Sequence, residues 1–112
     1  MQTELVIFKK AYDFSQWLLQ HTGKFPKSHR FSVAVRLENV MLEFLRQISV
    51  ANRRKQKLPI LHAADEELMT LKIYLRLSHD SKFISTKSYE YAVRQTEEIG
   101  RLLGGWIKSQ AA

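Results

Sequence analysis

Apolar residues recur at three- and four-residue steps along most of the chain, which places them on one face of an α-helix. Gly, Pro and polar residues separate four such segments. The pattern predicts helices from about Thr3 to Thr22, from about Phe31 to Arg54, from near Pro59 to the SHDSKFIS segment, and from Ser85 or Thr86 to about Ser109. Because the connections are short, neighbouring helices should run antiparallel. The predicted fold is all-α, an up-down-up-down four-helix bundle in a single domain over residues 1–112.

Two of these segments hold more apolar residues than one core requires. A bundle helix needs about three core positions in seven. The third segment adds Met69, Ile73 and Leu77 to its Leu stripe, and the second adds Met41 and Leu45. This surplus favours burial against further copies of the chain, so a homo-oligomer is predicted. A single, generously packed core is the alternative.

Three glycines interrupt the last predicted helix, at Gly100, Gly104 and Gly105. An interior Gly costs a helix about 1 kcal/mol relative to Ala, so a reason for them is expected. Gly100 and Gly104 share one face, where the missing Cβ atoms let a neighbouring backbone approach. Trp106 follows them and is large enough to pack. Gly100, Gly104 and Trp106 are therefore predicted to join the packing between subunits, with fraying from Gly104 as the alternative.

The charge balance indicates a polyanionic partner. The chain has 18 Lys and Arg against 11 Asp and Glu, a net charge of +7. No acidic residue lies between Asp13 and Glu38, or between Glu43 and Asp65. The second window contains a corner of four cations: Arg53, Arg54, Lys55 and Lys57. Cations without neighbouring acids attract phosphates, which favours nucleic acid as the partner.

Two further groups of cations follow from the predicted topology. The first and third loops share one end of an alternating bundle, which gathers basic residues there: Lys24, Lys27, Arg30, Lys82 and Lys87. On the last helix, cations recur every seven residues: Lys87, Arg94, Arg101 and Lys108. That step drifts only about 20° around a helix, so they form a ridge roughly 30 Å long that could follow a phosphate backbone. Glu90 and Glu97 each precede an Arg by four residues, so a solvated face with weak ion pairs is the alternative.

No residue pattern indicates an active site, a metal site or a cofactor. Cys is absent, which excludes disulfides and thiolate ligands. His62 with a following acid has helical ligand spacing, but one pair is more typical of a solvated helix start. Lys72 and Arg76 lie one turn apart, beside the Leu stripe, and Arg76 with His79 is the nearest approach to the Arg–His pair of a helical ribonuclease. The chain is predicted to be a binding module.

No apolar run reaches the length of about 18 residues that a membrane span requires. The first ten residues lack the basic start and long apolar stretch of a signal peptide. A cytoplasmic protein without a membrane partner is therefore expected.

Three segments resemble a known family. LHAADEELMTLKIYLRLSHD (61–80) and ISTKSYEYAVRQTEEIGRLLGGWIKS (84–109) are similar to the accessory variability determinant (Avd) proteins of diversity-generating retroelements. FPKSHRF (25–31) also resembles this family and its relatives, the intervening-sequence four-helix-bundle proteins. The resemblance covers most of the chain, and the IGRLLGGW ending is its most specific part.

The resemblance implies a four-helix bundle that forms a homopentamer with a basic surface. It also implies binding to the element's reverse transcriptase and to nucleic acid, chiefly RNA, with DNA as a further partner. The complex copies a template-repeat RNA into cDNA that is mutagenised at adenines. The polymerase supplies the chemistry, so no catalysis, cofactor or small-molecule substrate is implied. The corresponding basic residues are Arg53, Arg54, Lys55, Lys57, Lys72, Arg76, Arg94 and Arg101. Lys72 stands where Arg is more usual, which argues against a bidentate phosphate contact there.

Two other functions stay open at this point. One is a structural protein of the intervening-sequence type with no role in nucleic-acid binding. The other is a small helical toxin or antitoxin with ribonuclease activity, in which His79 would be the catalytic candidate.

Overall fold

Four long helices make up most of the computed structural model, which describes residues 2–111, with side chains from residue 4 on. A short helix and one π-helical turn precede the second long helix. The elements are α1 (Gln2–Thr22), α2 (Lys27–His29), η1 (Arg30–Ala34), α3 (Val35–Arg53), α4 (Leu58–Asp80) and α5 (Thr86–Ala111). Within the described range there is no strand, and the predicted all-α four-helix fold is confirmed.

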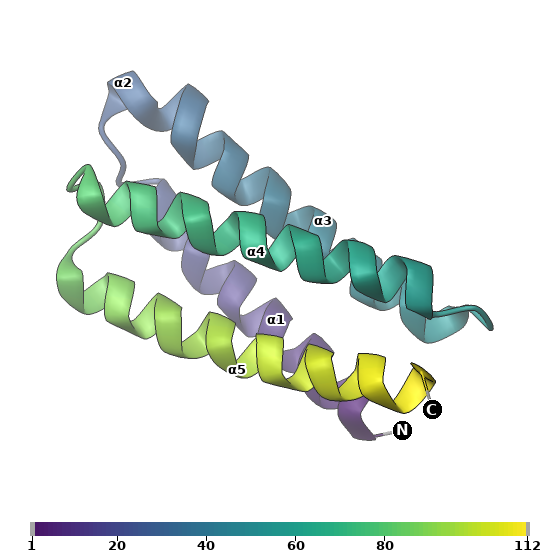
Figure 1. Cartoon of the computed structure of the whole chain (residues 1–112). Coiled ribbons are helices and arrows are strands. Elements are labelled where there is room, and N and C mark those ends of the chain that lie inside the picture. Colours follow the sequence, from purple (N-terminus) through teal and green to yellow (C-terminus); the bar gives the residue numbers. More distant parts are fainter. Residues whose placement is uncertain (1, 112) are drawn as a thin grey trace.

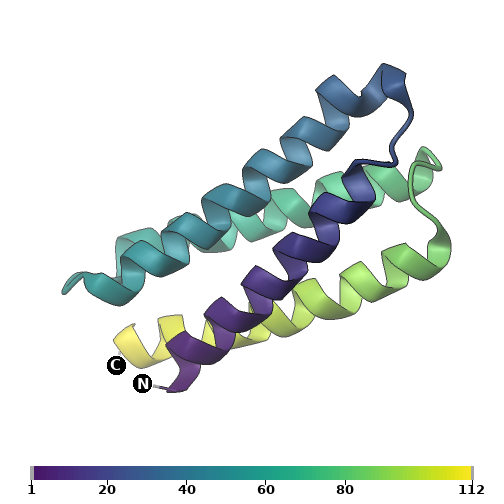
Figure 2. The same ribbon diagram turned by 180° about the vertical axis from the view of Figure 1, so that it is seen from behind.

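The long helices alternate in direction and form a bundle of 45 × 23 × 19 Å (Figures 1 and 2). α1 and α4 both pack against α3 and α5, and lie diagonally across from each other. The α1–α2 and α4–α5 connections meet at one end of the bundle, and the α3–α4 connection lies at the other end with both ends of the chain (Figure 1). We call the first the double-loop end (residues 23–34 and 81–85).

Most of the core is built from the predicted apolar stripes. Met41 is also buried in it and Leu45 packs against it, which corrects their expected place in the surplus of the second helix. The largest fully buried side chains of the core are Ile7, Phe14, Phe25, Leu37, Met41, Phe44, Ile48, Leu61, Leu71, Leu75, Ile99 and Leu103. Burying a Leu, Ile or Phe side chain contributes about 1.5–3 kcal/mol, which makes this core the main source of stability. α1 carries two parallel apolar stripes, and only the one that contains Ile7 and Phe14 lies inside.

The ends of α4 and α5 follow local backbone chemistry. Pro59 lies in the first turn of α4, where a missing N–H leaves no hydrogen bond unmade. The N–H groups of Lys82 and Phe83 close the other end on the carbonyl oxygens of His79 (2.9 Å) and Ser78 (2.8 Å). This is a Schellman motif, and Lys82 takes the left-handed position (φ 65°) that Gly usually fills.

The helix predicted from Phe31 begins earlier and less regularly than its pattern indicates. The backbone is already helical at Lys27, and η1 inserts a wider turn before α3. Ring contacts between the two loops hold this segment: Phe83 lies 5.6 Å from Phe25 and 4.5 Å from His29, between ring centroids. These contacts join residues more than 50 positions apart, so the local pattern could not indicate them.

Ser85 is the N-cap of α5, because its Oγ accepts a 3.0 Å hydrogen bond from the backbone N–H of Ser88. We expect Ser85→Ala to lower the free energy of unfolding by about 1 kcal/mol, measured by urea denaturation. Ser81→Ala is the matched control in the same connection, and should change stability by less than about 0.5 kcal/mol. Equal losses in the two variants would contradict the assignment of the cap.

Candidate nucleic-acid and partner-binding surfaces

Three of the four predicted corner cations lie free on the surface after α3. Arg53, Arg54 and Lys55 are exposed, and none of them forms an ion pair with any residue in the range 4–111. We call these three residues the cationic corner. Their charge is available to an external anion, as the acid-free sequence window predicts.

Lys57, the fourth cation, has a different role. Its Nζ donates hydrogen bonds to the carbonyl oxygens of Ala51 (2.8 Å), Asn52 (3.3 Å) and Arg54 (2.6 Å). These carbonyls end α3, where the helix dipole is negative and the backbone lacks helical partners. Lys57 therefore holds the corner in shape, and it is not the free surface cation that the sequence suggested.

The ridge on α5 is exposed along its length, at Lys87, Arg94, Arg101 and Lys108. Neither ion pair expected from the four-residue spacing forms among the described residues. Arg101 instead donates a hydrogen bond to Glu98, three residues before it. The guanidinium holds the pKa of the Glu98 carboxyl below its usual value. Arg101 is thus partly compensated, and Arg94 is not.

The structure brings Lys72 and Arg101 together along the groove between α4 and α5, which Asp65 and Glu97 also line. A Cβ atom at Gly100 would lie 3.4 Å from Cδ2 of Leu68 and 3.7 Å from Nζ of Lys72. Gly100 therefore permits a close approach of α4 and α5 within one chain. This corrects its expected place between subunits.

The other two residues of α5 that were expected in subunit packing, Gly104 and Trp106, differ in exposure. Trp106 is only 2% exposed and belongs to the core of its own chain, so it is not available to a second copy. Its indole lies there because α5 continues to Ala111 and turns this position inward. A Cβ atom at Gly104 would meet nothing within 4 Å, which leaves that position open.

Two separate apolar faces remain on the outside of the bundle. Met69, Ile73 and Leu77, spaced by four residues on α4, are 58%, 57% and 50% exposed, and we call them the α4 stripe. The second face, the α1–α3 face, is the outer stripe of α1 with one residue of α3: Leu5, Phe8, Tyr12, Leu19 and Leu42. Its two helices meet in grooves that join Phe8 to Ile48 and Leu19 to Leu42. Contiguous apolar surface of this kind usually marks an interface.

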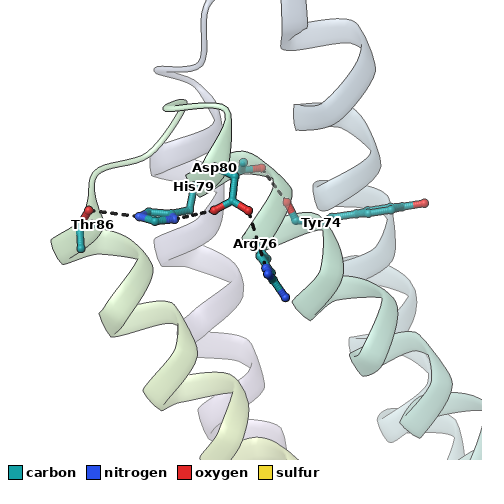
Figure 3. A network of polar contacts seen from close by, with 6 residues as sticks. Tyr74, Arg76, His79, Asp80 and Thr86 are labelled. Carbon is teal, nitrogen blue, oxygen red and sulfur yellow. Dashed lines mark hydrogen bonds and ion pairs between the residues drawn. The ribbon is translucent and has the colours of Figure 1, made fainter.

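His79 lies at the centre of a polar network at the double-loop end (Figure 3). Its ring nitrogens lie 3.1 Å from Oδ1 of Asp80 and 3.1 Å from Oγ1 of Thr86. Nε of Arg76 lies 3.7 Å from the other Asp80 oxygen. The ring also stacks on Tyr89 at 4.5 Å. Arg76 and His79 therefore both interact with Asp80. The cleft that His79 lines with Thr86 does not include Arg76 in its lining, whereas the helical-ribonuclease hypothesis requires both residues to face one cleft.

No group of three His, Asp or Glu within residues 4–111 is arranged to hold a metal ion. None of the helices in the described part is both long enough and apolar enough to span a membrane.

Comparison with known proteins agrees with the sequence resemblance. A family model described as bAvd-like matches residues 5–110. The chain belongs to the bAvd-like family. The predicted relation to Avd proteins is thus confirmed, and an accessory role is implied for this bAvd-like protein.

A search of curated proteins found no match to this bAvd-like chain. Among solved structures, it is similar to a protein of unknown function from the S23 ribosomal protein family of Bacteroides thetaiotaomicron VPI-5482. The two share 18% identity and superpose with a TM-score of 0.87, over 95% of this chain and 98% of the other. At that identity the likeness shows a shared fold, in line with the predicted relation to intervening-sequence bundle proteins.

Removing the Lys57 ammonium tests its structural role in this bAvd-like protein. Lys57→Met should lower the free energy of unfolding by about 1–2 kcal/mol, because three carbonyl oxygens at the end of α3 lose their donor. Lys55→Met removes the same charge from an exposed neighbour and should change stability by less than about 0.5 kcal/mol. Urea denaturation measures both. If the two variants were equally stable, Lys57 would be an ordinary surface cation.

Proposed function

We propose that this protein is a non-catalytic accessory subunit of a diversity-generating retroelement. It assembles as a ring of identical copies, and it holds the element's reverse transcriptase and template RNA through its basic surfaces. Membership of the bAvd-like family supports the accessory role. The observation that carries the nucleic-acid half of the proposal is the cationic corner, whose three side chains are exposed and unpaired among the described residues.

The placement of the two apolar faces supports the ring. The α4 stripe lies diagonally across the bundle from α1, which carries most of the α1–α3 face, so a contact between the two joins different faces of two copies. Contacts between unlike faces propagate from copy to copy and close into a ring when the rotation permits. The family resemblance gives five as the subunit number.

Assembly would strengthen weak individual phosphate contacts. Five copies with a net charge of +7 each would carry about +35, and would present five cationic corners to one RNA. Contacts that are weak in one subunit then act together, and the release of counterions makes the binding strongly dependent on salt. A structural protein without a nucleic-acid role, the competing function, would show no such dependence.

Reversing the charge of the cationic corner tests the RNA contact. Arg53→Glu with Arg54→Glu should weaken binding to the template-repeat RNA at least tenfold and flatten the fall of affinity with salt, measured by fluorescence anisotropy. Lys9→Glu with Arg46→Glu is the matched control. It makes the same change in net charge at residues already paired, Lys9 with Asp13 (2.9 Å) and Arg46 with Glu43 (2.7 Å).

The control should lose much less affinity than the corner variant. Equal losses would mean that only net charge matters, and an unchanged corner variant would remove the corner from the binding surface. Affinity that barely varies with salt in the unmodified protein would contradict the phosphate-contact model as a whole.

A carboxylate in the α4 stripe tests the assembly. Ile73→Asp should convert the oligomer to the 13.2 kDa monomer, because the contact would bury a charge without a partner. The side chain is exposed in the single chain, so the fold should persist, which circular dichroism can verify. Gln20→Asp, on an exposed α1 position outside both apolar faces, is the control and should remain assembled. Light scattering reports the mass, and an unmodified protein that is already monomeric would contradict the ring.

A further inference from the structure

Phe31 is the most exposed large apolar side chain among the described residues, with 89% of its surface open to solvent. It lies in η1 at the double-loop end, outside both apolar faces. The three residues before it and the one after it in sequence are polar or cationic, and Ser28 and Ser32 are also exposed. An aromatic ring in such surroundings is unlike the apolar clusters that anchor protein interfaces, where hot-spot residues sit among other apolar groups.

The segment that carries Phe31 is held firmly from its inner side. Nη2 of Arg30 donates hydrogen bonds to the carbonyl oxygens of Gly23 (3.2 Å) and Phe25 (3.4 Å). The ring of His29 packs on Phe83, and Ala34 is buried in the core. With the residues on both sides fixed, the π-helical turn directs the intervening Phe31 outward. Turns of this kind recur at functional sites.

The charge around this ring suits a phosphate backbone. Phe31 lies in the acid-free window between Asp13 and Glu38. Lys24, Lys27 and Arg36 are exposed, and none of the three is ion-paired with a residue in the described range. Lys27 precedes Phe31 by four residues, about one helical turn. This stretch of chain therefore combines an exposed aromatic ring with unpaired cations, and proteins bind single strands with that combination.

We propose that Phe31 stacks on an unpaired base of single-stranded nucleic acid, while Lys24, Lys27 and Arg36 contact the neighbouring phosphates. This rests on the proposed function, and it adds a second surface at the opposite end of the bundle from the cationic corner. The preference is for single strands, because bases in a duplex are already stacked and cannot receive the ring. RNA and DNA both qualify, since every base has a π-face.

Two variants of one residue test the stacking contact. Phe31→Ala should weaken binding to a 12-nucleotide oligo(U) about tenfold and leave binding to an RNA hairpin duplex within twofold. Its salt dependence should match that of the unmodified protein, because no charge changes. Phe31→Trp should keep the affinity and show emission that oligo(U) quenches. The native Trp106 is buried and Trp17 is half-buried against His21, so the added exposed indole dominates the quenching.

Lys27→Met is the charge control, and should weaken single-strand and duplex binding alike. If Phe31→Ala bound oligo(U) as tightly as the unmodified protein, while the corner reversal still weakened RNA binding, the stacking role would be wrong and the proposed function would stand. If the unmodified protein bound neither RNA at low salt, both would be wrong. If Phe31→Ala lowered the assembled mass and left RNA affinity unchanged, the Phe31 side chain would belong to a contact between copies. The stacking role would then be overturned.

Discussion

The surface of this protein depends on one constraint: α4 carries apolar side chains on opposite faces, and a four-helix bundle can bury only one of them. Leu68, Leu71 and Leu75 face the core, and the α4 stripe faces away from it. α1 repeats the arrangement, with Ile7 and Phe14 inside and Phe8 and Tyr12 outside. The outer stripes are only partly buried in the single chain, with Phe8 38% and Met69 58% exposed. Burial in the proposed assembly would account for them, and the surplus would then serve function more than the stability of one chain.

The basic residues form two groups: some bond to other groups of the same chain, and the others are exposed without an ion pair and can bind an external anion. Lys57 closes α3, Arg30 ties two loop carbonyls, and Arg101 bonds to Glu98. The cationic corner and the cations around Phe31 have no such partners in the described part of the chain. Both lie beside loops in acid-free windows, where no carboxylate is near enough in sequence to pair with them. Net charge alone would not have separated the two groups, because a lysine that caps a helix counts the same as a free one.

The fold could be predicted from the sequence because it depends on local periodicity. Three- and four-residue steps located all four long helices, and short connections gave their alternation. The sequence allowed either Ser85 or Thr86 as the cap of the last helix. The hydrogen bond from the Ser88 N–H to Ser85 identifies Ser85 as the cap. The π-helical turn escaped prediction, because contacts of Phe25 and His29 with the distant Phe83 impose it. For the same reason the sequence could not show how exposed Phe31 is.

The candidate surfaces were less predictable, because a residue's type does not show which way it points. The cationic corner could be predicted, because the sequence has no acidic residue between Glu43 and Asp65. Trp106 was expected to pack between subunits because of its large apolar side chain, but its register on α5 turns it into the core of its own chain. The outer stripe of α1 was visible as a second apolar row, but choosing the inner row required the positions of α3 and α5.

The separation of the two basic surfaces to opposite ends of the bundle bears on how an accessory ring could work. If copies pack side by side through the α4 stripe and the α1–α3 face, the two ends of every bundle become opposite rims. The cationic corners would line one rim and the Phe31 segments the other. At the first rim, Phe8 shares a groove with Arg53 but would be buried between copies. That rim would then offer charge alone, and so suits any phosphate backbone, including that of a folded template. The second adds a stacking face, and so favours unpaired strands. A ring with unlike rims can distinguish the two states of a nucleic acid by where each binds, without any base-specific contact.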